Sequence, residues 1–229
     1  MNYSDKNTAI LLFARSANEE ARKKNFVAKA PLKRNVAISK RLFLEVHSKC
    51  VNAGFPVFHL DEKSQKGSSF AERLKYSFQH VFNQGYKNVI AIGNDCPNLS
   101  VGDIKIAAKK LASCSSVLGE TQKGGVYLFA LSLNAFQEID LNQIVWNSNQ
   151  VFSQLKSSLS KRKETFLLDK KSEFNSQMDS AEFSLFLNNQ LSNWLLSQIN
   201  KPEANFNEFL SSILYSYSEC IDSRGPPMV

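Results

Sequence analysis

The sequence lacks the features of a membrane-spanning or secreted protein. No run of eighteen or more apolar residues occurs, and the N-terminus MNYSDKNTAILLF has no basic segment followed by a long apolar one and a cleavage site. The four cysteines are far apart, without a Cys-x-x-Cys pair or histidines at zinc-ligand spacing, which predicts reduced thiols. We therefore expect a soluble, cytoplasmic protein without a membrane span.

Internal repeats and low-complexity tracts are lacking as well. This excludes a repeat array, and a hydrophobic content of 43% with 11% aromatic residues excludes a disordered polymer. A chain of 229 residues is long enough for one well-buried domain with an appendage, or for two small domains. The composition therefore predicts a chain that folds alone.

The excess of positive charge, +7 over the whole chain, is concentrated in one segment. Between Arg15 and Lys49, ten lysines and arginines stand against three glutamates, which accounts for the entire excess. Such a segment favours an anionic partner, for example a nucleotide, a phosphorylated substrate or an acidic membrane, although a solvated helix face explains it equally well. A nucleic-acid partner is not expected, because the segment has no recognisable motif and no interleaved aromatic residues.

Short apolar runs alternate with stretches of helical periodicity. Strands are predicted at residues 8–14, 56–60, 88–93, 116–119 and 126–131, with a possible edge strand at 165–168. Helices are predicted at about 36–52, from Phe70 to a stop at Gly85, after Ser100, and at about 147–159. The second and third begin with capping boxes, SFAE at 69–72 and SVGD at 100–103. This alternation predicts an α/β fold with a mostly parallel sheet and helices on both faces.

Two further helices are predicted near the C-terminus. Apolar residues follow helical spacing from Met178 to Ile199, and Pro202 opens a second such stretch that continues to Tyr217. The two stretches predict a helical hairpin. Its apolar faces are expected to pack on the domain or on each other, with a homodimer interface as the alternative.

The carboxyl ends of the predicted strands are the expected place for a ligand, because open α/β sheets bind ligands there. The segments in that position are Arg15 with the residues that follow, 61–69, 94–100 and 120–125. Asp95 follows a strand and precedes a helix, where a carboxylate is well placed to bind a hard divalent cation. An Asx turn leading into Pro97 explains the same residue without a metal.

Five motifs stand in a fixed order along these segments. They are FAR at 13–15, QKG at 65–67 with FAER at 70–73, IGNDCPNL at 92–99, VLG and KGGVYLFAL within 117–131, and Trp146. Each is weak singly, but in this order and spacing they resemble the DUF2064 family, whose members are taken to be glycosyltransferases or nucleotide-diphospho-sugar transferases of the GT-A superfamily. The resemblance covers about residues 8–175. We therefore expect a GT-A-like domain at 1–175 and a C-terminal helical extension at 176–229.

The resemblance implies a GT-A Rossmann-like fold that binds a nucleotide or nucleotide sugar together with a divalent metal, Mg²⁺ or Mn²⁺. It implies glycosyl or nucleotidyl transfer, while the acceptor stays unknown. Asp95 matches the metal-binding aspartate of the family's G-[SN]-D-x-P motif, and Arg15 and Lys23 match its basic positions. The other expected nucleotide- or substrate-binding residues are Gln65, Asn94, Gly124 and Gly125.

The sequence departs from the family pattern in three places. The loop after the first strand reads SANEEARKKN at 16–25 instead of P-x-P-G-x-x-K-T-R, which predicts a partly helical loop that approaches a phosphate less closely. Lys123 replaces the acidic residue of the family's D-G-G-[YF]-Y motif. The later D-x-D motif survives only as DKK at 169–171.

Two interpretations of Lys123 stay open. Exchanging a carboxylate for an ammonium near Asp95 weakens cation binding there, which predicts an impaired transferase or a non-catalytic GT-A-fold protein that binds a ligand or partner. Alternatively, the ammonium of Lys123 replaces the metal and neutralises phosphate charge directly. For a transferase, Asp95 and Lys123 are the candidate catalytic residues.

Overall fold

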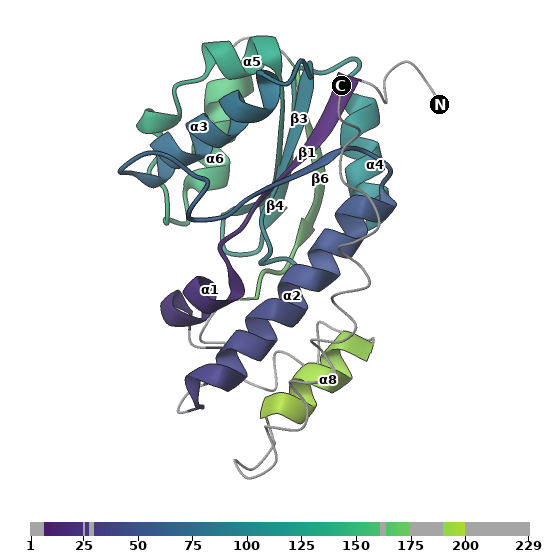
Figure 1. The fold of residues 1–229 in the computed structure, drawn as a ribbon. Coiled ribbons are helices and arrows are strands. Elements are labelled where there is room, and N and C mark those ends of the chain that lie inside the picture. Colours follow the sequence, from purple (N-terminus) through teal and green to yellow (C-terminus); the bar gives the residue numbers. More distant parts are fainter. Residues whose placement is uncertain (1–6, 25, 28–29, 161–163, 175–189, 200–229) are drawn as a thin grey trace.

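A six-stranded sheet forms the centre of the molecule (Figure 1). The computed structural model describes residues 7–24, 26–27, 30–160, 164–174 and 190–199. The strands are β1 (Thr8–Phe13), β2 (Val57–Leu60), β3 (Asn88–Ile92), β4 (Ser116–Thr121), β5 (Val126–Ser132) and β6 (Thr165–Lys171). Their order is β2-β1-β3-β5-β4-β6, and neighbours are parallel except where β5 pairs with β3 and β4. The expected mostly parallel sheet is confirmed, with β5 as the one reversed strand.

Helices cover both faces of this sheet, as predicted. The described helices are α1 (Ala17–Lys23), α2 (Leu32–Asn52), α3 (Phe70–Phe82), α4 (Val101–Lys110), α5 (Leu133–Glu138), α6 (Val151–Ser160) and α8 (Gln190–Ile199), with a short 3-10 helix at Leu141–Gln143. The helices α3, α5 and α6 lie on one face, and α2 and α4 lie on the other (Figure 1). No helix in the described part of the chain has both the length and the apolar character that crossing a bilayer requires.

Each face of the sheet contributes to a separate hydrophobic core. Along β1, Leu11 points to the core formed with α3 and α6, while Ile10 and Leu12 point to the core formed with α2 and α4. All three side chains are fully buried. The continuous apolar run of β1 follows from this burial on both faces, which is typical of strands in the middle of a parallel sheet.

The predicted capping boxes are both present and fix where two helices begin. At α3, the backbone N–H of Glu72 donates to Ser69 Oγ at 3.1 Å. At α4, the N–H of Asp103 donates to Ser100 Oγ at 3.1 Å, and the N–H of Ser100 donates to Asp103 Oδ2 at 2.7 Å. These bonds satisfy amide groups that the first turn of a helix leaves free. The loop that carries Asp95 therefore ends at a well-defined helix N-terminus.

The segment after β1 forms helix α1, which confirms the predicted helical character of this loop. Ser16 caps the helix and is itself held by Glu62, which follows β2: both the N–H and the hydroxyl of Ser16 donate to Glu62 at 2.7 Å. Burial raises the pKa of Glu62, but the hydrogen bonds from Ser16 together outweigh it and leave the pKa below its ordinary value. The start of α1 is therefore fixed to the end of β2.

A third, smaller apolar cluster joins α2 to α8 through Leu42, Leu191 and Leu195, together with the stacked rings of Phe26 and Phe174. Helix α8 is the end of the first helix of the expected C-terminal hairpin. The remainder of that hairpin, and with it the possible homodimer surface, lies outside the described residues.

The helix predicted at about 147–159 begins later, at Val151. Residues 147–150 form a turn instead, in which Asn147 has a positive φ of 62°. The turn packs closely against the loop between β4 and β5, because the carbonyl oxygen of Asn149 lies 2.0 Å from the place where a Cβ of Gly124 would stand. At the start of α6, the N–H of Phe152 donates to the carbonyl of Gly124 at 2.9 Å. This long-range contact overrides the helical periodicity of the sequence.

Candidate functional site

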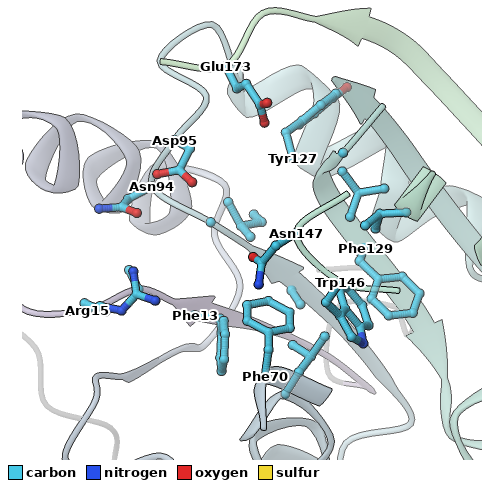
Figure 2. A pocket seen from close by; sticks show the side chains of 18 of the residues that line it. Phe13, Arg15, Phe70, Asn94, Asp95, Tyr127, Phe129, Trp146, Asn147 and Glu173 are labelled. Carbon is cyan, nitrogen blue, oxygen red and sulfur yellow. The ribbon is translucent and has the colours of Figure 1, made fainter. Parts of the chain in front are cut away.

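A cavity of about 530 Å³ opens at the carboxyl ends of β1 and β3 (Figure 2). Because β5 runs in the opposite direction, its first residues reach the same edge of the sheet. The start of α3, Trp146 and the turn at residues 147–150 complete the wall. The cavity therefore lies where an open α/β sheet is expected to bind its ligand.

One end of the cavity is aromatic. The rings of Phe13 and Phe70 meet edge to face with centroids 5.6 Å apart, and Phe70 lies 4.8 Å from Trp146. The indole N–H of Trp146 donates to the carbonyl of Leu141 at 2.9 Å, which fixes the orientation of the ring. Figure 2 shows these three rings together at one side, with Asn147 beside them. This end suits a flat, largely apolar group.

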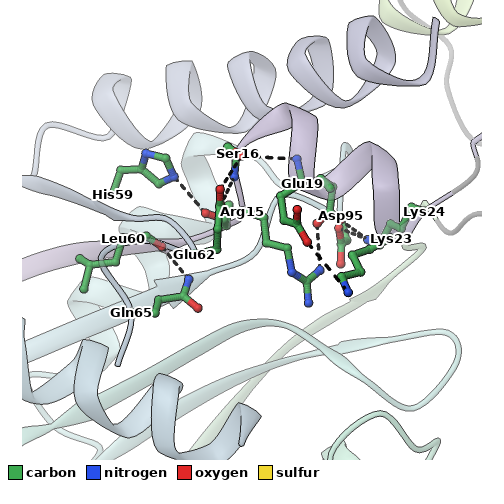
Figure 3. Close-up of polar contacts among 12 residues, drawn as sticks. Arg15, Ser16, Glu19, Lys23, Lys24, His59, Leu60, Glu62, Gln65 and Asp95 are labelled. Carbon is green, nitrogen blue, oxygen red and sulfur yellow. Dashed lines mark hydrogen bonds and ion pairs between the residues drawn. The ribbon is translucent and has the colours of Figure 1, made fainter. Parts of the chain in front are cut away.

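The opposite end is charged and is built by α1 and the loop after β3 (Figure 3). Arg15 Nη1 lies 3.0 Å from Glu20 Oε2, and Lys24 Nζ lies 2.9 Å from Glu20 Oε1. The same ammonium of Lys24 makes an ion pair and a hydrogen bond with Asp95 Oδ1. Four side chains of alternating charge therefore form one connected chain.

Lys24 and Glu20 are both withdrawn from solvent, with side chains 16% and 4% exposed. Burial lowers the pKa of the Lys24 ammonium, but the negative charges of Asp95 and Glu20 outweigh it, and the net result is a raised pKa. Lys24 is therefore positively charged at neutral pH. Its ammonium is a fixed cation at the edge of the cavity.

Six of the eight residues expected in the site line this cavity. They are Arg15, Gln65, Asn94, Asp95, Lys123 and Gly125. Lys23 does not: its side chain is 61% exposed and its ammonium lies 3.9 Å from Glu19. Gly124 does not line it either, but a Cβ at this residue would lie 2.0 Å from the carbonyl oxygen of Asn149. Because Gly124 has no side chain, the backbone of Asn149, which lines the cavity, can lie directly against it.

Sequence reasoning missed Glu20, Lys24 and Glu173, which also line the cavity. The spacing of Glu20 and Lys24, four residues apart, was a signal for an ion pair on one helix face. Glu173 had no such signal. It is brought to the site after β6, where the N–H of Phe174 donates to the carbonyl of Asp95 at 2.6 Å.

The residues around Asp95 do not fit a divalent cation held by protein side chains. The carboxylate of Asp95 already binds the ammonium of Lys24. Within the described part of the chain, no group of three or more His, Cys, Asp or Glu side chains could hold a metal ion. Lys123, by contrast, is exposed and makes no hydrogen bond or ion pair with the residues that the structure describes.

This fold is shared with solved proteins of the nucleotide-sugar transferase class. A proposed nucleotide-diphospho-sugar transferase from Desulfovibrio desulfuricans G20 has a TM-score of 0.67 at 14% identity, over 92% of this chain and 98% of that one. A family model described as "Uncharacterized protein conserved in bacteria (DUF2064)" matches residues 24–148. The chain therefore belongs to the DUF2064 family, as its motifs predicted.

Two looser structural matches are 4-diphosphocytidyl-2C-methyl-D-erythritol synthase from Anaerococcus prevotii DSM 20548 and Rv0371c from Mycobacterium tuberculosis H37Rv in complex with manganese. The first has a TM-score of 0.46 at 9% identity, over 85% of this chain and 99% of that one. The second has a TM-score of 0.39 at 12% identity, over 78% and 97%. No curated protein matches the sequence.

Proposed function

We propose that this chain is a GT-A-type transferase that binds a nucleotide or nucleotide sugar in the cavity and transfers a glycosyl or nucleotidyl group. The observation that carries the proposal is the division of one cavity into a charged end, with the ammonium of Lys24 and the guanidinium of Arg15, and an aromatic end. A nucleotide has the same division, with charged phosphates at one end and a flat base at the other. The cavity lies at the edge of the sheet where the fold class binds ligands.

The cations that line the cavity are suited to the phosphates. Four cations, Arg15, Lys24, Arg73 and Lys123, line the cavity against three carboxylates, Glu20, Asp95 and Glu173. Lys123 makes no hydrogen bond or ion pair with the described residues, so none has to be broken when its ammonium binds a ligand. In a partly enclosed cavity, such an excess of positive charge attracts and orients a diphosphate.

The aromatic end is suited to the base. Phe13, Phe70 and Trp146 present ring surfaces on which a planar heterocycle can stack, and stacking of a base on an aromatic side chain contributes about 1–3 kcal/mol. Asn147 lies beside these rings (Figure 2) and carries an amide with both donors and an acceptor for the edge of a base.

During transfer, the bond between the transferred group and the leaving phosphate breaks, while the oxygen of an acceptor hydroxyl forms the new bond to that group and releases its proton to solvent. Negative charge then grows on the phosphate oxygens of the leaving group. The resemblance implied Mg²⁺ or Mn²⁺ for this charge, but Asp95, the residue that matches the family's metal ligand, already binds the ammonium of Lys24. We propose that the side chains of Arg15, Lys24 and Lys123 meet the charge instead.

A second candidate is a non-catalytic GT-A-fold protein that binds the same ligand or a partner. It is favoured by Lys123, a cation where the family has a carboxylate, and by the ion pair that engages Asp95. The two candidates share the ligand but differ in turnover. Release of a nucleoside diphosphate or of pyrophosphate from a panel of donors and acceptors supports the transferase, and binding without any turnover across the panel supports the second candidate.

The test of the shared ligand is a thermal-shift panel of nucleoside diphosphates and nucleotide sugars, each with EDTA, Mg²⁺ or Mn²⁺. A ligand at about a hundred times its Kd is expected to raise Tm by about 5 °C or more. Lys123→Ala is expected to weaken the binding about tenfold or more, because it removes a charged contact to phosphate. No shift with any nucleotide in the wild-type protein counts against both candidates.

Tryptophan fluorescence tests the position of the base. In a Trp194→Phe variant, Trp146 is the only tryptophan of the chain, and it contacts the aromatic end of the cavity. Stacking of a base beside Phe70 is expected to quench its emission in proportion to occupancy. A nucleotide that raises Tm but leaves the emission unchanged contradicts this placement of the base.

A further inference from the structure

The ammonium of Lys24 lies in an unusual position for a lysine. Lys24 caps the C-terminus of α1, where its own N–H donates to the carbonyl of Glu20 at 2.8 Å, and its side chain turns inward to Asp95 on the loop after β3. Only 16% of that side chain is exposed. The side chain of the preceding residue, Lys23, is 61% exposed. Two adjacent lysines are therefore in opposite environments.

The position of Lys24 is fixed from several directions. Glu20 holds the ammonium from within the same helix at 2.9 Å, and Arg15 holds the other oxygen of Glu20 at 3.0 Å. The N-terminus of the helix is tied to Glu62 through Ser16. The fold therefore already orders the long side chain of Lys24, so ligand binding loses little further side-chain entropy at this residue.

We infer that Lys24 is the resident cation at Asp95, and that the protein binds the phosphates of its ligand without a divalent metal. A metal ion at the same carboxylate oxygen would have to displace the ammonium and leave that charge beside the metal. Asp95 is then a positioning residue, which holds Lys24 toward the cavity. The part of the inference that concerns phosphates rests on the proposed function, whereas the part that concerns Asp95 does not.

This role differs from the one that the sequence suggested for Lys123. Lys123 is exposed and makes no bond with the described residues, so it meets only a ligand. Lys24 is engaged before any ligand arrives, and together with Arg15 it offsets two carboxylates, Asp95 and Glu20, that would otherwise repel a diphosphate. Removing Lys24 leaves Asp95 without this cation and Glu20 with Arg15 alone in the described part of the chain.

The first experiment titrates the protein with Mn²⁺ alone and follows free Mn²⁺ by electron paramagnetic resonance. The wild-type protein is expected to bind Mn²⁺ weakly. Lys24→Met is expected to bind it about tenfold more tightly or better, because Asp95 is freed and Glu20 keeps Arg15 as its one cation among the described residues. Adding Asp95→Asn to Lys24→Met should abolish the gain. The matched control, Lys23→Met, removes the same charge one residue earlier and should behave like the wild type.

Two outcomes overturn the inference. One is tight Mn²⁺ binding by the wild-type protein that Asp95→Asn abolishes. The other is a Lys24→Met protein that folds, as judged by circular dichroism, yet gains no affinity for Mn²⁺. If Lys24→Met does not fold, Lys24→Gln provides the same test with a polar side chain of similar length, and the wild-type titration still decides the first outcome.

The second experiment compares the Tm shift caused by nucleoside diphosphates in EDTA and in Mn²⁺. Equal shifts in the wild-type protein support the inference, and a shift that requires Mn²⁺ overturns it. Lys24→Arg, which keeps the charge, is expected to retain more of the shift than Lys24→Met. If no nucleotide shifts Tm under any condition, the proposed function fails, while the Mn²⁺ titration still tests the role of Lys24 at Asp95.

Discussion

At the scale of single residues, the wall of the cavity depends on the absence of a Cβ at Gly124. Its φ of +79° lies in the left-handed region, and the space where a Cβ would stand is filled by the backbone of Asn149. Gly54 has a similar φ of +86°, but nothing lies within 4 Å of its Cβ position. A comparison of substitutions at the two glycines therefore separates the cost of a left-handed backbone from the cost of a steric clash.

We predict that Gly54→Ala lowers the free energy of unfolding by about 1–2 kcal/mol, the cost of a left-handed L-residue. Gly124→Ala is expected to cost about 1–3 kcal/mol more, because Asn149 and the turn at residues 147–150 must also move. Urea unfolding of both variants measures the difference. Equal losses would show that Asn149 yields without cost, and the turn would then be a loose part of the cavity wall.

The residue scale also shows what sequence reasoning could and could not reach. The placement of Asp95 followed from local signals, an apolar run before it and a capping box after it. Its partner could not be found in this way, since Lys24 is 71 residues distant and the contact depends on how α1 is docked. Lys23 and Lys24 are chemically identical, but successive helical residues point about 100° apart, and only the structure shows which one faces the cavity.

At the scale of elements, the helix that follows Asp95 is fixed by its cap. Ser100 and Asp103 exchange three hydrogen bonds, and Lys171 of β6 lies 3.1 Å from Asp103. The cap is therefore also a junction between α4 and the edge of the sheet. The capping box was predicted from four residues of sequence, whereas the contact with Lys171 depended on the position of β6.

We predict that Ser100→Ala lowers the free energy of unfolding by about 1–2 kcal/mol, because it leaves an amide of the first turn and part of Asp103 without partners. Ser113→Ala, at an exposed residue, is the control and should change stability by less than about 0.5 kcal/mol. Both are measured by urea unfolding. Similar small losses in the two variants would mean that water replaces the cap.

At the scale of the whole molecule, the core on the α2 and α4 side of the sheet encloses two ionisable thiols. Cys50 and Cys96 are 0% and 2% exposed, and Cys50, Cys96 and Cys114 are free, as expected for reduced thiols. Cys220 lies outside the described residues. Burial raises the pKa of Cys50 from 9.0 to about 12 and that of Cys96 from 9.0 to about 11.

These raised pKa values predict a loss of stability in alkali. Above about pH 9 the unfolded chain releases both thiol protons while the folded chain keeps them, so the folded state is disfavoured as pH rises. The expected loss is about 1.4 kcal/mol per pH unit for each thiol between pH 9 and 11. Urea unfolding at pH 8, 9.5 and 10.5 measures it. An unchanged free energy of unfolding up to pH 10.5 contradicts the burial of both groups.

The overall α/β architecture was predictable from sequence because its signals are local: apolar runs, helical periodicity and caps. The division of the cavity into two ends was not, since Phe13, Phe70 and Trp146 come from three separate elements. Nor was the reversal of β5, because an apolar strand reads the same in either direction. Long-range packing decides both features.

The reversed strand also bears on how the chain acquires its structure during synthesis. β5 lies between β3 and β4, so β3 has no neighbour on that side until residues 126–132 have emerged from the ribosome. Until then the nascent chain presents an open strand edge, of the kind that pairs with other chains. A pause in synthesis before residues 126–132 have left the ribosome would prolong this exposure, and a pause after they have left it would not.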